Sequence, residues 1–91
     1  MTDPHLLTLN HLKKLKLISE NSSLISISST TLDFTVQHKV PRDSSQKLLL
    51  TLANHQTYYG SISNAKAEDK NCIFIFSDGA FYQGQCSKGK F

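Results

Sequence analysis

Apolar and polar side chains follow a repeating pattern along this chain. Phe34, Tyr58 and Tyr82 lie 24 residues apart, and the segments that lead into them align without a gap. These segments read LISISSTTLDF from residue 24, LLLTLANHQTY from residue 48 and CIFIFSDGAFY from residue 72. Because self-similarity at a fixed period is typical of repeat proteins, residues 24–91 are predicted to contain about three copies of one structural unit.

Each copy has the pattern of a β-hairpin. A short run of β-prone apolar residues is followed by turn-forming residues and then by a second alternating run. The third copy turns at Asp78-Gly79, and glycine tolerates the positive φ that tight hairpin turns require. We expect turns near residues 29–31, 54–55 and 78–79. The predicted fold is mainly β, with successive antiparallel hairpins in a twisted, elongated open sheet.

Side chains of a strand alternate between two faces, so the pattern also predicts which residues share a face. In the third hairpin one face receives Cys72, Phe74, Phe76, Ala80, Tyr82, Gly84 and Cys86, and in the second it receives Leu48, Leu50, Leu52, Tyr58, Gly60 and Ile62. The first hairpin offers Leu24, Ser26, Ser28, Phe34, Val36 and His38. The polar connections 39–47 and 63–71 are predicted to be solvent-exposed loops.

Residues 1–23 precede the repeats and are expected to form a cap region. Asp3-Pro4 resembles a helix N-cap followed by proline at the first helical position, and leucines recur at every third residue from Leu6 to Leu15. A strand that contains Leu15 and Leu17 and turns back near residues 20–22 fits the same residues. We expect a short helix or irregular cap over about residues 4–13, followed by a strand, and helix and strand both remain open for residues 4–18.

Composition is that of an ordinary folded domain. The 91 residues are 38% hydrophobic and 19% charged, which predicts a single domain over residues 1–91. The net charge of +3 is spread along the chain, with one tight group at Lys13, Lys14 and Lys16, and does not indicate nucleic-acid binding. Two cysteines and the lack of a secretory leader favour a cytoplasmic location. No apolar run approaches the roughly 20 residues that a membrane-spanning helix needs.

The last copy resembles a MORN repeat. Residues 78–91 read DGAFYQGQCSKGKF and match the family pattern DG-x-x-Y-x-G-x-[aromatic]-x-x-G-[KR] except at Cys86, where the aromatic residue is missing. The match is partial over residues 54–77, where Tyr58 and Gly60 keep the pattern and Ala65 replaces the second glycine. The first copy keeps only Phe34. The resemblance implies stacked antiparallel hairpins that form a groove-like sheet, and a scaffold or binding role, with binding to membrane lipids also proposed for such proteins.

Residues suited to catalysis do not form a recognisable set. His5, His11, His38 and His55 occur in unrelated contexts without the spacing of metal ligands, so we expect no enzyme activity, no cofactor and no metal site. Cys72 and Cys86 fall near each other in the third hairpin. They are compatible with ordinary core residues and, in an oxidising compartment, with a cross-strand disulfide.

The expected function is therefore a non-enzymatic protein-interaction or scaffold unit. The chain stops inside the repeat frame, so its last strand should be an edge that another protein or a second copy can extend. The candidate interaction surface consists of the aromatic residues Tyr58, Tyr59, Phe74, Phe76, Phe81, Tyr82 and Phe91. The alternative is peripheral binding to anionic membrane phospholipids through basic residues such as Lys13, Lys14 and Lys16.

Overall fold

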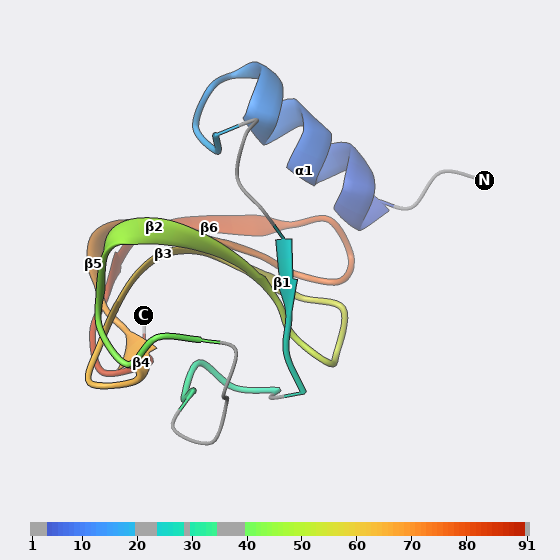
Figure 1. The fold of residues 1–91 in the computed structure, drawn as a ribbon. Coiled ribbons are helices and arrows are strands. Elements are labelled where there is room, and N and C mark those ends of the chain that lie inside the picture. Colours follow the sequence, from blue (N-terminus) through green and yellow to red (C-terminus); the bar gives the residue numbers. More distant parts are fainter. Residues whose placement is uncertain (1–3, 20–23, 29, 35–39, 91) are drawn as a thin grey trace.

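The computed structural model describes residues 4–19, 24–28, 30–34 and 40–90, and these residues form a mainly β fold with a single helix (Figure 1). The elements are α1 (Pro4–Lys14), β1 (Leu24–Ser26), β2 (Ser44–Thr51), β3 (Thr57–Ser63), β4 (Lys66–Ala67), β5 (Asp69–Ile75) and β6 (Phe81–Cys86). All the strands belong to one open sheet in the order β1-β2-β3-β5-β6, with β4 paired to β3. The predicted β-rich open sheet is confirmed at this level.

Two of the three predicted hairpins are present. β2 and β3 pair antiparallel around residues 53–55, and β5 and β6 pair antiparallel around residues 77–79. In both turns the residue two positions before the second strand has a positive φ, 63° at His55 and 94° at Gly79. The hairpins close through Leu52 N–H donating to Gln56 O at 2.7 Å and Phe76 N–H donating to Ala80 O at 2.8 Å.

The prediction for the first copy was wrong in both pairing and face. β1 runs parallel to β2, with Leu24 opposite Leu49 and Ser26 opposite Thr51, so the sheet is mixed rather than purely antiparallel. Ile25 and Ile27 pack on the core, whereas Leu24 is 53% exposed. Burial of the two isoleucines decides the register, because a shift by one residue turns every side chain to the other face. Val36 and His38 of this predicted hairpin lie outside the described residues.

The two connections predicted as loops also contribute to the sheet. β2 already begins at Ser44, and the segment from 63 to 71 holds β4 and the first residues of β5. Asn64 and Ala65 both have positive φ, 54° and 60°, which is the conformation of a tight two-residue hairpin turn between β3 and β4. Ala65 and Ala67 are buried, so this segment is part of the core rather than a solvent-exposed loop.

The concave side of the curved sheet is filled by the chain itself. Predicted faces of the second and third hairpins are confirmed there, since Leu50, Tyr58, Phe74 and Cys72 share one core cluster. The same cluster includes Ile27, Leu32, Phe34 and Val40 from the connection between β1 and β2, and residues 30–34 lie across the open side of the curve (Figure 1). The Phe34 and Tyr58 rings lie 6.2 Å apart. The groove expected of stacked hairpins is therefore occupied.

The convex side is covered by α1. Leu9, Leu12 and Ile18 are buried against the outward-facing residues Leu49, Tyr59, Ile73 and Ile75 of three strands. The helix begins at Pro4, as predicted, and ends where Lys16 takes a φ of 61°. There Leu17 N–H donates to Leu12 O and Lys16 N–H donates to Lys13 O, both at 3.0 Å, which is the bonding of a Schellman motif. The strand expected after the helix, and the alternative hairpin strand through Leu15 and Leu17, are both wrong, because residues 15–18 form the turn that ends α1.

Candidate interaction surface

Among the strands that the structure describes, β6 is one edge of the sheet and has β5 as its single neighbour. Antiparallel ladders alternate between hydrogen-bonded and non-hydrogen-bonded pairs. Since Phe76 and Ala80 form a hydrogen-bonded pair, Phe74 with Tyr82 and Cys72 with Gly84 are the next two. Residues 81 and 83 lie between these pairs, and residue 85 follows the last of them. The backbone N–H and C=O groups of all three consequently point away from β5 toward the open edge.

One end of this edge is closed by local bonds. The hydroxyl of Tyr82 donates to the carbonyl of Gln85 at 2.8 Å, which occupies an outward acceptor. Beyond it Ser87 N–H donates to Lys90 O at 2.7 Å, so the chain folds back on itself. The edge therefore remains accessible over Phe81 and Gln83, where a short extended segment can be added.

Burial divides the predicted aromatic surface. Tyr58, Tyr59 and Phe74 are at most 8% exposed and belong to the two cores, so the structure removes them from any contact surface. Phe76 and Tyr82 are half-buried, and Phe76 packs edge-on against Phe74 with ring centroids 4.9 Å apart. Phe81 is 46% exposed, on the face opposite Tyr82 as the alternation predicted. Phe91 lies outside the described residues.

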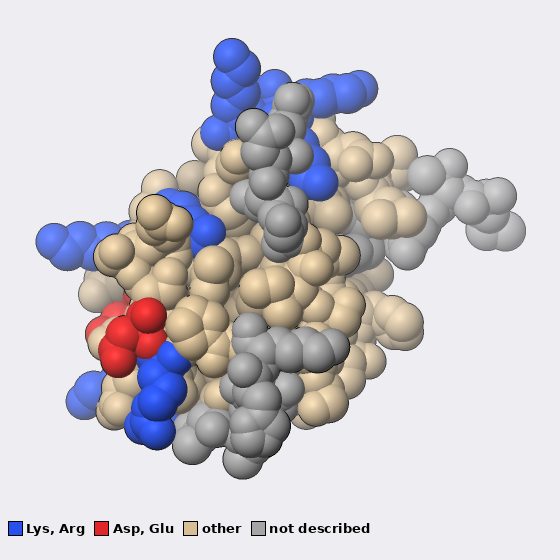
Figure 2. Space-filling model, in the orientation of Figure 1, with Lys and Arg blue, Asp and Glu red and all other residues tan. Residues whose placement is uncertain are grey.

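A second surface, which the sequence pattern only hinted at, lies on α1 and the turn that follows it. Leu6, Leu7, Leu15 and Leu17 are 50%, 55%, 55% and 39% exposed. Lys13, Lys14 and Lys16 lie among them, and we call residues 6–7 and 13–17 the α1 surface. Figure 2 shows Lys side chains around the helix at the top of the molecule and acidic side chains away from it, at the lower left. The signal in the sequence was an excess of leucines over what a single helical face can bury.

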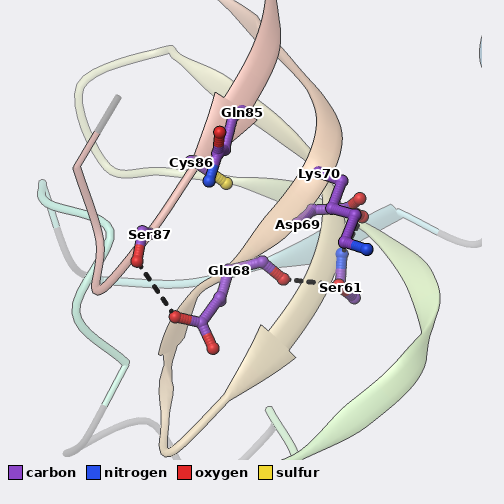
Figure 3. Close-up of a pocket in the computed structure, with 7 residues that line it drawn as sticks. All are labelled: Ser61, Glu68, Asp69, Lys70, Gln85, Cys86 and Ser87. Atoms are coloured by element: carbon purple, nitrogen blue, oxygen red, sulfur yellow. Dashed lines mark hydrogen bonds between the residues drawn. The ribbon is translucent and has the colours of Figure 1, made fainter.

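A depression of about 490 Å³ lies between β3, β5 and β6 (Figure 3). Its lining consists of Ser61, Glu68, Asp69, Lys70, Gln85, Cys86 and Ser87. Ser87 Oγ donates to Glu68 Oε1 at 3.1 Å, and Ser61 Oγ donates to the Glu68 carbonyl. These bonds connect the strands to one another.

Asp69 is the best-connected side chain of this depression. Its carboxylate accepts from the Ser61 and Asn71 backbone N–H groups at 2.8 and 2.9 Å and from Lys47 Nζ at 3.1 Å. Burial opposes ionisation of Asp69, but the bonds from Asn71, Ser61 and Lys47 outweigh it and lower the pKa to about 2. The carboxylate is thus hydrogen-bonded by groups of the protein itself. These three bonds hold β5 in place where its register with β6 shifts. We interpret the carboxylate as structural.

The two cysteines are buried free thiols beside Tyr58. Burial, with a smaller effect of the neighbouring Cys86 thiol, raises the pKa of Cys72 to about 12. The Tyr58 hydroxyl lies 3.5 Å from Cys86 Sγ, and burial also raises the pKa of Tyr58. A thiol that is uncharged and inaccessible at neutral pH is a poor nucleophile, so Cys72 has the properties of a core residue.

The remaining candidates for chemistry are dispersed. His11 and His55 are exposed on α1 and in the β2–β3 turn, while His38 and the side chain of His5 lie outside the description. Across the part of the chain that the structure describes, no cluster of His, Cys, Asp and Glu is suited to hold a metal ion. No described helix is long and apolar enough to cross a membrane.

Comparison with protein-family models, curated proteins and solved structures found no match to this chain. The resemblance to MORN repeats therefore rests on its motif residues.

Proposed function

We propose that this protein is a protein-interaction module that binds an extended segment of another polypeptide chain by adding it to the edge of β6. The observation that carries the proposal is the edge at Phe81 and Gln83, on a strand whose one neighbour within the described residues is β5. Such an edge supplies backbone donors and acceptors at the spacing of a strand, and strand addition is a common way of recognising peptides.

Phe81 gives the edge an apolar anchor. Its side chain is 46% exposed, and it lies opposite Ile75, which is completely buried under α1. An added strand would place alternate side chains next to Phe81, where an apolar residue of the partner gains burial that a polar residue does not. We therefore expect the bound segment to have one apolar face. The internal filling of the groove leaves the edge, and not the concave side, as the binding region.

A selection from random displayed peptides about as long as β6, carried out on the immobilised chain, tests this function. We expect peptides with alternating apolar residues to be enriched, and their binding to fall at least tenfold with Phe81→Lys, because the change places a charge in the contact. The matched control is Gln46→Lys, which adds the same charge at an exposed position of β2, a strand that does not pair with β6. Light scattering on the same samples reports whether a second copy uses this edge.

Failure to enrich any peptide, combined with an unchanged monomeric mass, would contradict the proposal. Equal binding by Phe81→Lys and Gln46→Lys would place the contact elsewhere on the molecule. Both variants change exposed residues, so their melting midpoints should stay close to that of the unmodified chain.

A further inference from the structure

The α1 surface exposes apolar side chains that the fold cannot bury by rearranging locally. Leu12 and Ile18 are completely buried and anchor the two ends of the turn that contains Leu15 and Leu17. The turn itself is fixed by the hydrogen bonds that end the helix, in which Leu17 N–H donates to Leu12 O. Turning either exposed leucine inward would pull Ile18 out of the core. The exposure is thus a stable property of the fold.

Charge on this surface has one sign. Residues 4–19 include Lys13, Lys14 and Lys16 and contain no Asp or Glu. Within the described residues these lysines form no salt bridge, and the ion pair found there joins Lys47 to Asp69 in another part of the molecule. Lys14 and Lys16 are exposed and Lys13 is partly exposed, so these side chains can reach an external anion. Because leucines alternate with these lysines, a partner that covers both needs anionic groups and an apolar region within a few ångströms of each other.

We propose that the α1 surface docks on a lipid bilayer that contains anionic phospholipids. A bilayer offers the required combination, because negatively charged headgroups lie directly above acyl chains. The lysines would meet headgroup phosphates and carboxylates, and the leucines at 6, 7, 15 and 17 would enter the boundary between headgroups and acyl chains. Leu15 and Leu17 lie in the turn that ends α1, beside the three lysines, and Leu6 and Leu7 lie in its first turn. This surface is distinct from β6, so the inference goes beyond the proposed function.

Flotation of the full chain with vesicles tests the docking. We expect binding to vesicles of phosphatidylcholine mixed with phosphatidylserine, and at least tenfold weaker binding to phosphatidylcholine alone. Raising the salt concentration should weaken the first interaction because exposed charges are screened within about 10 Å at 0.1 M. Part of the binding should survive at high salt, since the contribution of the leucines does not depend on ionic strength. Free glycerophosphoserine in excess should not displace the protein, because a headgroup alone offers no acyl boundary.

Two variants separate the charged from the apolar contribution. Because each lysine near an anionic surface strengthens binding roughly fivefold, replacing Lys13, Lys14 and Lys16 by Gln should weaken it about 100-fold. Replacing Leu15 and Leu17 by Ser should remove the salt-resistant part. A charge-matched control replaces three exposed lysines at the other end of the chain by Gln, namely Lys70, Lys88 and Lys90, and should change binding less than threefold.

Four results would overturn the docking surface. They are no flotation with acidic vesicles at low salt, equal flotation with neutral vesicles, equal losses in the two triple variants, and binding to soluble polyglutamate but not to vesicles. The last result would indicate an acidic protein partner instead. Gln83→Pro, which changes the β6 edge, should leave flotation unchanged. Loss of peptide binding and loss of vesicle binding are therefore separate outcomes.

Discussion

Tyr82 repeats, 24 residues later, the geometry of Tyr58. The Tyr58 hydroxyl donates to the carbonyl of Ser61 at 2.7 Å, and that of Tyr82 donates to Gln85 at 2.8 Å, three residues on in both cases. Each ring also lies over the glycine two residues ahead, Gly60 or Gly84. The second and third units of the chain therefore share a side-chain arrangement as well as a hairpin, although one tyrosine is completely buried and the other is not.

The glycines beneath these rings should tolerate alanine to different degrees. A Cβ added at Gly60 would lie 2.5 Å from the Tyr58 hydroxyl oxygen and 3.0 Å from Cys72 Cβ, inside the core. At Gly84 it would lie 2.8 Å from the hydroxyl oxygen of Tyr82, which is half-buried and has more room to move. We expect Gly60→Ala to lower the free energy of unfolding by about 2–3 kcal/mol and Gly84→Ala by about 1 kcal/mol.

Urea unfolding of the two variants measures the difference. Tyr58→Phe is the matched control for Gly60→Ala, because it removes the hydroxyl that the added methyl would meet. The double variant should lose less stability than the two single losses added together. Equal stability of Gly60→Ala and the unmodified chain would contradict this packing.

The equivalent turn residues His55 and Gly79 give a second prediction. Both have positive φ, which is unfavourable for a residue with a Cβ and free of that penalty for glycine. His55 is exposed, so His55→Gly should raise the free energy of unfolding by roughly 0.5–1 kcal/mol, net of the greater flexibility of glycine in the unfolded chain. Thermal melts of His55→Gly, His55→Ala and the unmodified chain check this prediction. A melting midpoint of His55→Gly no higher than those of the other two proteins would contradict the turn geometry.

Acid should destabilise the protein through Asp69. The pKa of this carboxyl is about 2 in the folded chain and 3.8 ordinarily, so the ionised form is favoured by folding. Its contribution to stability is present in full above the ordinary value and is lost as the pH falls toward the folded-state value. We expect up to about 2 kcal/mol to disappear between roughly pH 5 and pH 2. Asp69→Asn should flatten this part of the stability profile.

Unfolding midpoints measured across that pH range for both proteins provide the comparison. Asp43→Asn is a suitable control, because Asp43 is exposed and its carboxylate accepts a hydrogen bond from the backbone N–H of Asn64 at 2.9 Å. A pH dependence of equal steepness in Asp69→Asn and the unmodified chain would show that other carboxylates account for it.

Local signals in the sequence were sufficient for the two later hairpins and for the start of α1. Asp78-Gly79 and the alternation of Phe74 with Tyr82 are encoded within a few residues, and turn chemistry and period determine such contacts. The helix start at Pro4 is equally local. The position of β6 at the end of the described strand order agrees with the expectation of an edge strand in the last copy.

The local pattern of apolar and polar residues did not predict the contacts between segments that lie far apart in the sequence. The parallel pairing of β1 with β2 depends on the cost of exposing Ile25 and Ile27, which local alternation from Leu24 could not weigh. The covering of the convex face by α1 had a signal that was not used: Ile73 and Ile75 alternate with Phe74 in β5, so both faces of that strand are apolar and both must be covered. Neither the local alternation nor the two apolar faces of β5 predicted that the concave side of the sheet is filled.

The most direct test of binding at the β6 edge is a calorimetric titration of a selected peptide into Gln83→Pro and Gln83→Ala. Gln83 turns its N–H toward the open edge, where proline is tolerated because it removes no bond to β5. Alanine keeps that N–H and serves as the control. A backbone hydrogen bond contributes about 1 kcal/mol, and the proline ring also blocks close approach, so we predict at least tenfold weaker binding by Gln83→Pro and a change below threefold for Gln83→Ala. Equal affinities of the two folded variants would contradict strand addition at β6.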